Sequence, residues 1–476
     1  MTSMSPIRRA PSASEPASDP LSPQMADPRL SPPMADRRGE AAPAMAGNRR
    51  DIGAPAPPVT IEDTGLEEGF LVQLLVKTIY RQGQEKVSEM ARALCLSPGL
   101  IEKLILTARD QRLMEPLGQL GASMTAEMRY GLTEKGKGWA LEALAQSEWI
   151  GPCPITLEQF RAQATRQAIR KEVLTRPMLE RVFAGLTLAP HLMQQLGPAV
   201  NSGASMLLYG PPGNGKSSIA TAICEAFYDR VYIPHAIVVD KAVIAVFDPT
   251  MHRRLDEEEV LDEGLRRGTN SYDTRYTICL RPTVETGGEL TIDMLDLRYN
   301  PVSRVYEAPM QMKASGGVLV IDDFGRQREA PQDIINRMII PLEKQVDYLS
   351  LMTGRKFEVA FDALIVFSTN IPPKQLVDDA ALRRLRYKIL IDRPDRDTYI
   401  KIFLRTAEKS GMEVSEEVLT HLLFDLYPGT EGAEMHAFHP RFLIDQTRSI
   451  CAYEEVAPQL RPEFLDRAWQ NLFTSE

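Results

Sequence analysis

Cysteines are few in this chain, and no long apolar run occurs in it. Five cysteines are scattered among its 476 residues, and no two of them form a CxxC pair. This pattern favours core thiols in a reducing cytoplasm over a disulfide framework. No apolar stretch approaches the ~18 residues that a membrane-spanning helix needs, and the N-terminus lacks the apolar region of a secretory signal. We therefore expect a soluble cytoplasmic protein without a membrane span.

An excess of positive charge is also lacking. The formal net charge is −9, so the chain as a whole has no electrostatic reason to bind nucleic acid, and any such contact would need a local basic patch. The composition is 25% charged and 43% hydrophobic. At this length, that composition supports two or three globular domains.

Residues 1–58 are rich in Pro, Ala, Ser, Arg and Met and nearly lack aromatic and β-branched residues. Such a segment buries too little apolar surface to offset the entropy lost on ordering. We predict a disordered arm.

Residues 59–150 have a globular pattern with four expected helices and two strands. Apolar residues recur at helical spacing in the first helix, and Ser97 followed by Pro98 is typical of a helix start. The elements are expected at 66–82, 87–94, 98–111, 113–116, 128–133 and 134–146. Three helices followed by a two-stranded wing resemble a winged helix-turn-helix domain.

The expected recognition helix of this domain, residues 99–109, is mostly aliphatic, and acidic residues slightly outnumber basic ones over the whole domain. DNA binding depends on neutralising phosphates with Lys and Arg. The charge pattern therefore favours a protein-interaction domain, with DNA binding as the disfavoured alternative.

A glycine-rich loop joins a short apolar stretch to the start of a helix. Residues 206–209 have the character of a buried strand, residues 210–217 read GPPGNGKS, and a helix follows. Such a loop turns its backbone N–H groups toward phosphate oxygens, and the helix dipole faces the same anion. Lys216 would contact the β- and γ-phosphates, and Ser217 would offer a hydroxyl to Mg²⁺. We predict a nucleoside triphosphate site formed by Gly210, Pro211, Pro212, Gly213, Asn214, Gly215, Lys216, Ser217 and Ser218.

A second motif is the apolar run 317–321, GVLVI, which ends in Asp322 and Asp323. Buried parallel strands gather functional residues at their carboxyl ends. We predict that Asp322 lies beside Ser217 and holds Mg²⁺ through water, and that Asp323 polarises the attacking water. At the second of these two acidic positions Glu is commoner than Asp. The Asp323 side chain is shorter, so it must approach that water more closely.

A third motif is residues 363–370, ALIVFSTN, a strand that finishes in polar residues. We expect Asn370 to hold the attacking water from the other side. The preceding residues 348–360 predict a hairpin around a turn at Thr353 and Gly354.

Together these motifs resemble the AAA+ ATPase superfamily over roughly residues 160–476. GPPGNGKS resembles Walker A, VLVIDD Walker B and FSTN the sensor 1 strand, and the hairpin before sensor 1 resembles the clade of MoxR-like and gas-vesicle-type ATPases. The stretch VDDAALRRLRYKI is similar to that of the family's arginine finger. The resemblance implies that Arg383 or Arg386 reaches a neighbouring subunit's γ-phosphate, with the adjacent Arg384 not excluded. It also implies that Arg441 is sensor 2, in a helical lid.

The predicted fold class is α/β, with a P-loop AAA+ parallel-sheet domain, a helical lid, a small N-terminal winged-helix domain and a disordered arm. We expect the arm at 1–58, the winged helix at 59–150, the nucleotide-binding domain at 151–393 and the lid at 394–476. An insertion is expected at about 231–305. Within it, the stretch from residue 231 through residue 248 is interpreted as a β-hairpin.

The predicted function is ATP hydrolysis with Mg²⁺ in a homo-oligomer, expected to be a hexamer, that remodels a protein client. Two alternatives stay open on the sequence. One is a DNA-bound regulatory ATPase that acts through the winged helix. The other is a slowly hydrolysing nucleotide switch, which Asp323 in place of Glu would suit.

Overall fold

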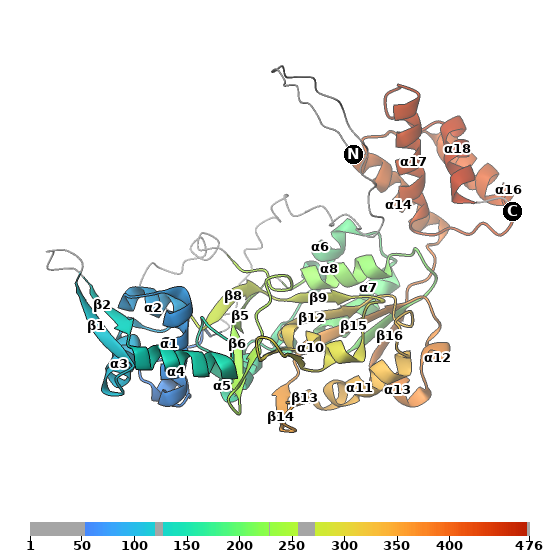
Figure 1. Cartoon of the computed structure of the whole chain (residues 1–476). Helices are drawn as coiled ribbons and strands as arrows, with labels where there is room; N and C mark the ends of the chain where they lie inside the picture. Colours follow the sequence, from blue (N-terminus) through green and yellow to red (C-terminus); the bar gives the residue numbers. More distant parts are fainter. Residues whose placement is uncertain (1–52, 120–126, 228, 256–271, 474–476) are drawn as a thin grey trace, which may run out of the picture. The chain divides into compact units, whose positions relative to one another are not determined.

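The computed structural model describes residues 53–119, 127–227, 229–255 and 272–473 (Figure 1). Contacts divide the chain into two units, Met1–Arg50 and Asp51–Glu476. The predicted disordered arm lies almost entirely outside the described residues. Within the described ranges, no helix combines the length and apolarity needed to cross a bilayer. All five cysteines are free, and four of them are buried, whereas Cys95 is half-buried.

The N-terminal module contains the four helices and two strands expected from the sequence. The strands pair antiparallel. Ser97 stands at the N-cap of α3 and Pro98 begins the helix, as predicted, although the Ser97 side chain makes no capping hydrogen bond. Thr133 instead caps α4 by accepting a hydrogen bond from the Gly136 N–H. The elements are α1 (Glu68–Gln82), α2 (Val87–Leu94), α3 (Pro98–Asp110), β1 (Met114–Gln119), β2 (Met128–Leu132) and α4 (Glu134–Gln146).

A five-stranded parallel sheet forms the centre of the following part. Its strand order is β16-β4-β15-β12-β9, and each neighbouring pair runs parallel. β12 and β15 are buried along their whole length, as expected for strands covered on both faces. The strands are β4 (Met206–Tyr209), β9 (Thr283–Thr286), β12 (Gly317–Ile321), β15 (Ala363–Thr369) and β16 (Tyr387–Leu390).

Alternate residues of the central strand β12 belong to two separate hydrophobic cores. Val318 and Val320 pack with α6, α7 and α8, whereas Leu319 and Ile321 pack with α11 and α13. Figure 1 shows these helices on opposite sides of the sheet. The helices are α5 (Leu157–Arg166), α6 (Arg176–Val182), α7 (Pro190–Ser202), α8 (Lys216–Glu225), α10 (Met310–Lys313), α11 (Pro331–Lys344), α12 (Pro373–Leu376) and α13 (Asp379–Arg384).

The region expected to be an insertion supplies most of a second five-stranded sheet of order β10-β11-β7-β6-β3, whose last strand, β3, comes from earlier in the chain, and it also holds a separate pair, β5 and β8. The hairpin predicted within residues 231–248 is present as β6–β7, but the first residues of that stretch belong to β5, which pairs with β8. The range 231–305 was also too wide, since it includes β9 of the central sheet. The strands are β3 (Ile155–Thr156), β5 (Arg230–Pro234), β6 (Ala236–Val239), β7 (Ala242–Ala245), β8 (Tyr276–Leu280), β10 (Arg298–Asn300) and β11 (Val305–Glu307).

The hairpin predicted before the third motif is confirmed. β13 (Val346–Ser350) pairs antiparallel with β14 (Lys356–Ala360), and Thr353 and Gly354 lie in the turn between them. Gly354 has a φ of 82°, a conformation that glycine adopts without steric cost.

The C-terminal residues form a helical bundle with its own hydrophobic core. Tyr399, Phe403 and Leu465 are among its fully buried side chains. The helix beginning at α15 passes through a π-helical stretch, His421–Leu426, before α16. The helices are α14 (Arg396–Lys409), α15 (Glu416–Thr420), α16 (Tyr427–Gly429), α17 (His439–Tyr453) and α18 (Pro462–Leu472).

A histidine in this bundle lies between two carboxylates. His421 Nδ1 is 3.0 Å from Asp425 Oδ2, and its Nε2 is 2.7 Å from Asp466 Oδ1 on α18. Burial lowers the pKa of His421, but the hydrogen bonds and charges of Asp466 and Asp425 outweigh this effect, so the pKa is raised. Because the folded state favours the protonated ring, its stabilising effect is complete below the unfolded pKa of ~6.5. It is lost as the pH rises through the folded value.

We expect His421→Leu to lower the thermal midpoint of unfolding more at pH 5.5 than at pH 8.5, by roughly 2 °C. Calorimetry of the full chain at both pH values measures this difference. The control is His191→Leu, since His191 is exposed on α7. An equal loss at both pH values would show that the charge of His421 does not stabilise the bundle.

Candidate nucleotide site

The glycine loop joins the carboxyl end of β4 to the first turn of α8, as the sequence predicts. Gly210 has a φ of 143°, and a Cβ atom there would lie 2.2 Å from the Ile391 carbonyl oxygen, so no larger residue fits. Gly215, at a φ of 86°, immediately precedes α8. Ser217 and Ser218 are exposed in the first turn of that helix. The loop therefore has the geometry of an anion cradle at a helix N-terminus.

The Lys216 side chain is folded back into the loop and is only 6% exposed. Its Nζ donates hydrogen bonds to the carbonyl oxygens of Gly210, at 3.0 Å, and Pro211, at 2.8 Å. Burial lowers the pKa of Lys216, while the negative charges of Asp322 and Asp323 oppose that shift. The ammonium group is thus held by weak, neutral acceptors. Phosphate oxygens would be stronger acceptors because they are charged.

Parallel pairing places the second and third motifs beside this loop. Tyr209, the last residue of β4, is paired with Thr369, the last residue of β15, so Gly210 and Asn370 leave the sheet side by side. Ile321 is paired with Phe367 in the same direction, so Asp322 and Asp323 follow at the same edge. Asp323 is exposed and Asp322 half-buried.

A cavity of about 220 Å³ opens between the first turn of α8 and the end of β12. Ser217 and Asp322, the predicted Mg²⁺ ligands, both line it. A hydroxyl and a carboxylate oxygen are ligands that suit Mg²⁺, which also keeps water and phosphate oxygens around it. The donor set therefore fits the ion. Among the described residues, no group of three or more His, Cys, Asp and Glu side chains is arranged around a metal position.

The loop after β9 forms another wall of this cavity, which sequence reasoning missed. Glu289 Oε1 accepts hydrogen bonds from Thr286 Oγ1, at 3.0 Å, and from the Gly287 N–H, at 2.8 Å. Burial raises the pKa of Glu289, but these hydrogen bonds outweigh that effect and lower it. The carboxylate thus fixes the shape of the Thr286–Gly287 turn.

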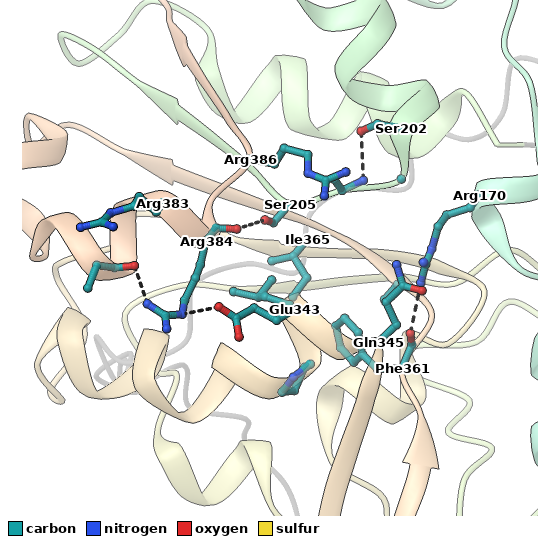
Figure 2. A pocket seen from close by; sticks show the side chains of 16 residues that line it. Arg170, Ser202, Ser205, Glu343, Gln345, Phe361, Ile365, Arg383, Arg384 and Arg386 are labelled. Carbon is teal, nitrogen blue, oxygen red and sulfur yellow. Dashed lines mark hydrogen bonds and ion pairs between the residues drawn. The ribbon is translucent and has the colours of Figure 1, made fainter.

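The candidate finger arginines lie away from this site. Arg386 precedes β16 and Arg383 lies in the last turn of α13, so both stand at the amino edge of the sheet, opposite the glycine loop. With Arg170 and Arg384 they line a cavity of about 500 Å³. Figure 2 shows the Arg384 side chain directed at Glu343, with its Nε 2.9 Å from Glu343 Oε1.

Arg383 and Arg386 differ from Arg384 in having no such partner. Both are exposed, and within the described parts of the chain neither guanidinium makes an ion pair or a hydrogen bond. The structure thus separates two unpaired arginines from one that its own chain neutralises. The sequence could not make this distinction, because the three residues lie within four positions.

The predicted sensor 2 residue, Arg441, lies in the first turn of α17. Its Nε is 3.6 Å from Asp445 Oδ2, and both side chains are exposed. The preceding residues contact the glycine loop instead. His436 Nδ1 lies 3.1 Å from the Pro212 carbonyl oxygen, and the Ala437 N–H donates to Asn214 Oδ1 at 3.1 Å.

Phe438 follows these two residues and immediately precedes α17. A Cβ atom on Gly213 would be 2.3 Å from the Phe438 ring, so the ring packs directly against the glycine loop. No motif in the sequence marked residues 436–438 as a contact of the nucleotide site.

Comparisons with known proteins agree with this arrangement in part. A family model described as a domain of unknown function, DUF8689, matches residues 395–471, which hold α14 to α18. Spastin from Anopheles gambiae is 27% identical over 106 residues, 22% of this chain and 13% of spastin, so the chain spans a small part of that relative. The α/β fold class predicted from the sequence is confirmed by the structure itself, in which a five-stranded parallel sheet of order β16-β4-β15-β12-β9 carries the glycine loop after β4.

The solved structures that resemble the chain do so at low sequence identity and low TM-score. NtrX from Brucella abortus is 14% identical with a TM-score of 0.37, covering 62% of this chain and 58% of NtrX. NtrX in complex with ATP is 14% identical with a TM-score of 0.30, covering 59% and 67%. A RuvB mutant from Thermotoga maritima is 13% identical with a TM-score of 0.34, covering 64% and 72%.

Proposed function

We propose that this chain is a Mg²⁺-dependent ATPase that hydrolyses ATP as a homo-oligomer and uses the energy to remodel a protein partner. One observation carries the proposal. Lys216, the Asp322–Asp323 pair and Asn370 come from three separate segments, and the central sheet brings them to one edge.

Each of these residues has a distinct task. Lys216 and the loop N–H groups bind the β- and γ-phosphates, and Ser217 with Asp322 would hold Mg²⁺. When bound, the ion would neutralise charge that develops on the phosphates. Exposed Asp323 accepts a proton from the attacking water, while the Asn370 amide orients the same molecule.

The arginines support an oligomer. Arg383 and Arg386 stand at the sheet edge opposite their own glycine loop, so neither serves the site of its own chain. Unpaired guanidinium groups at a surface suit a ligand supplied by a neighbour, such as the γ-phosphate bound to the next subunit. A closed ring, for which we propose six subunits, lets every subunit both give and receive an arginine.

The N-terminal module, which we assign as a winged helix, is proposed to bind the protein partner. The exposed side chains of α3 include two acids and two bases, so this face has no net charge to neutralise DNA phosphates. It also exposes Leu106, which is 56% accessible. A neutral face with an apolar residue suits a protein surface better than a nucleic acid.

We expect Asp323→Asn to bind ATP as well as the wild type does but to hydrolyse it about 100-fold more slowly, because the amide cannot accept the proton of water. Phosphate release and titration with a fluorescent ATP analogue measure the two properties. The trapped ATP form should retain the partner in a pull-down. Asp379→Asn, a change at an exposed residue of α13, is the control. Wild-type turnover by Asp323→Asn would remove Asp323 from the mechanism.

A further inference from the structure

The turn that carries the two carboxylates has an unusual backbone. Asp323 has a φ of 46°, in the left-handed region that residues other than glycine rarely adopt. A residue keeps this conformation only when its surroundings hold it there. The position of the Asp323 carboxylate therefore depends on whatever fixes the turn.

One side chain, Gln327, makes most of the polar contacts inside the turn. Its Nε2 lies 3.2 Å from the Asp322 carbonyl oxygen and 3.4 Å from that of Asp323. The same nitrogen is 3.1 Å from the Gly287 carbonyl oxygen, and Gln327 Oε1 accepts a hydrogen bond from the Gly325 N–H at 2.8 Å. Gln327 is only 9% exposed.

The amide suits this place in one orientation only. Its NH₂ group faces three carbonyl oxygens, and its oxygen faces an N–H group. Reversing the amide would set oxygen against three oxygens and NH₂ against N–H. A glutamate would lose the donors, and a leucine would leave three part-buried carbonyl groups without this partner.

Neighbouring strands fix the rest of the turn. The Asp322 N–H donates to the Thr286 carbonyl oxygen, and the Phe324 N–H donates to that of Ser368. Thr369 Oγ1 donates to the Phe324 carbonyl oxygen at 2.6 Å. These bonds tie the turn to β9 and β15, but only Gln327 bonds to both carboxylate-bearing residues, as far as the described residues extend.

We infer that Gln327 is a positioning residue for hydrolysis. It holds the backbone of Asp322 and Asp323 in the conformation that presents both carboxylates, and it links them to the Thr286–Gly287 loop across the cavity. It does not touch ATP itself. This inference rests on the proposed function, in which Asp323 polarises the attacking water.

Two variants of the full chain test it, Gln327→Glu and Gln327→Leu. We expect kcat for ATP to fall about 100-fold in both, as misplacing a reacting group by about 1 Å does. The Kd of a fluorescent ATP analogue should change less than about threefold, because the glycine loop is untouched. The matched controls are Gln375→Glu and Gln375→Leu, since Gln375 is exposed on α12.

The pH dependence separates positioning from general damage to the fold. The carboxyl group introduced by Gln327→Glu is buried, so its pKa should lie above the usual ~4.3. When protonated, it regains one donor. Turnover relative to wild type should therefore rise severalfold from pH 8 to pH 5.5 in this variant, with no such rise in Gln327→Leu. A flat ratio, or kcat within about threefold of wild type in both variants, overturns the inference.

Hydrogen exchange distinguishes failure of this inference from failure of the proposed function. If the wild type releases no phosphate, the proposed ATPase activity is wrong. The backbone amides of residues 322–325 then decide the role of Gln327. Faster exchange in Gln327→Leu than in Gln375→Leu supports a fixed turn, and equal exchange overturns it. If Gln327→Leu does not fold, Gln327→Glu is compared with the wild type at pH 5.5 and pH 8.

Discussion

Replacing Lys216 with alanine should weaken ATP binding at least ~100-fold, equivalent to about 3 kcal/mol. The Lys216 ammonium is buried in the loop, where its hydrogen-bond acceptors are two backbone carbonyl oxygens. Phosphate oxygens at that position would supply the negative charge that these carbonyls lack. Titration of the purified variant with a fluorescent ATP analogue measures the loss.

Loss of binding by Lys216→Ala should not come with loss of stability. Burial lowers the pKa of Lys216, which means that the fold disfavours its charge. Alanine removes this cost, so the thermal midpoint should stay the same or rise. The control Lys374→Ala, at an exposed residue of α12, should bind ATP normally. Affinity that survives in Lys216→Ala would show that the loop is not the phosphate site.

The second large effect is expected for Arg386→Ala, which should lower kcat about 1000-fold while leaving ATP affinity unchanged. An arginine that stabilises transition-state charge contributes on this scale. Arg386 stands at the far edge of the sheet from its own glycine loop, so we propose that its phosphate partner belongs to another subunit. Phosphate release at a protein concentration that supports assembly measures kcat.

Arg384→Ala is the matched control, because Glu343 holds that guanidinium on its own chain. It should retain turnover, and Arg383→Ala completes the set. Mixing Arg386→Ala with Asp323→Asn should restore part of the activity, since each variant supplies what the other lacks. If Arg384→Ala alone stops turnover, the ion pair must break on assembly and Arg384 is the finger. If none of the three matters, hydrolysis does not use a neighbour's arginine.

Local motifs were predictable because their residues are contiguous. The strand, the glycine loop and Lys216 at the start of α8 form a single run, and their order alone predicts phosphate binding. The same holds for the four helices of the N-terminal module and for the β13–β14 hairpin, whose short-range periodicity and turn residues suffice.

Long-range pairing was not predictable in the same way. The stretch predicted as a hairpin, residues 231–248, does contain one in β6–β7, yet β5 at its start pairs with β8, more than 40 residues further along the chain. β9 was assigned to an insertion but forms the edge of the central sheet. A strand's own residues show that it will be buried, and the choice of partner depends on which surfaces meet after the chain has folded.

The sequence by itself determined the chemistry of this protein: a glycine loop with a lysine, a strand ending in two aspartates and a polar strand end. It did so because each of these motifs consists of residues that are adjacent in the sequence. The tertiary structure alone decided which residues surround that chemistry. It paired Arg384 with Glu343, left Arg383 and Arg386 without a partner among the residues that the structure describes, and bonded the Gln327 amide to the turn of Asp322 and Asp323. These contacts join residues from different elements, and only packing brings such residues together.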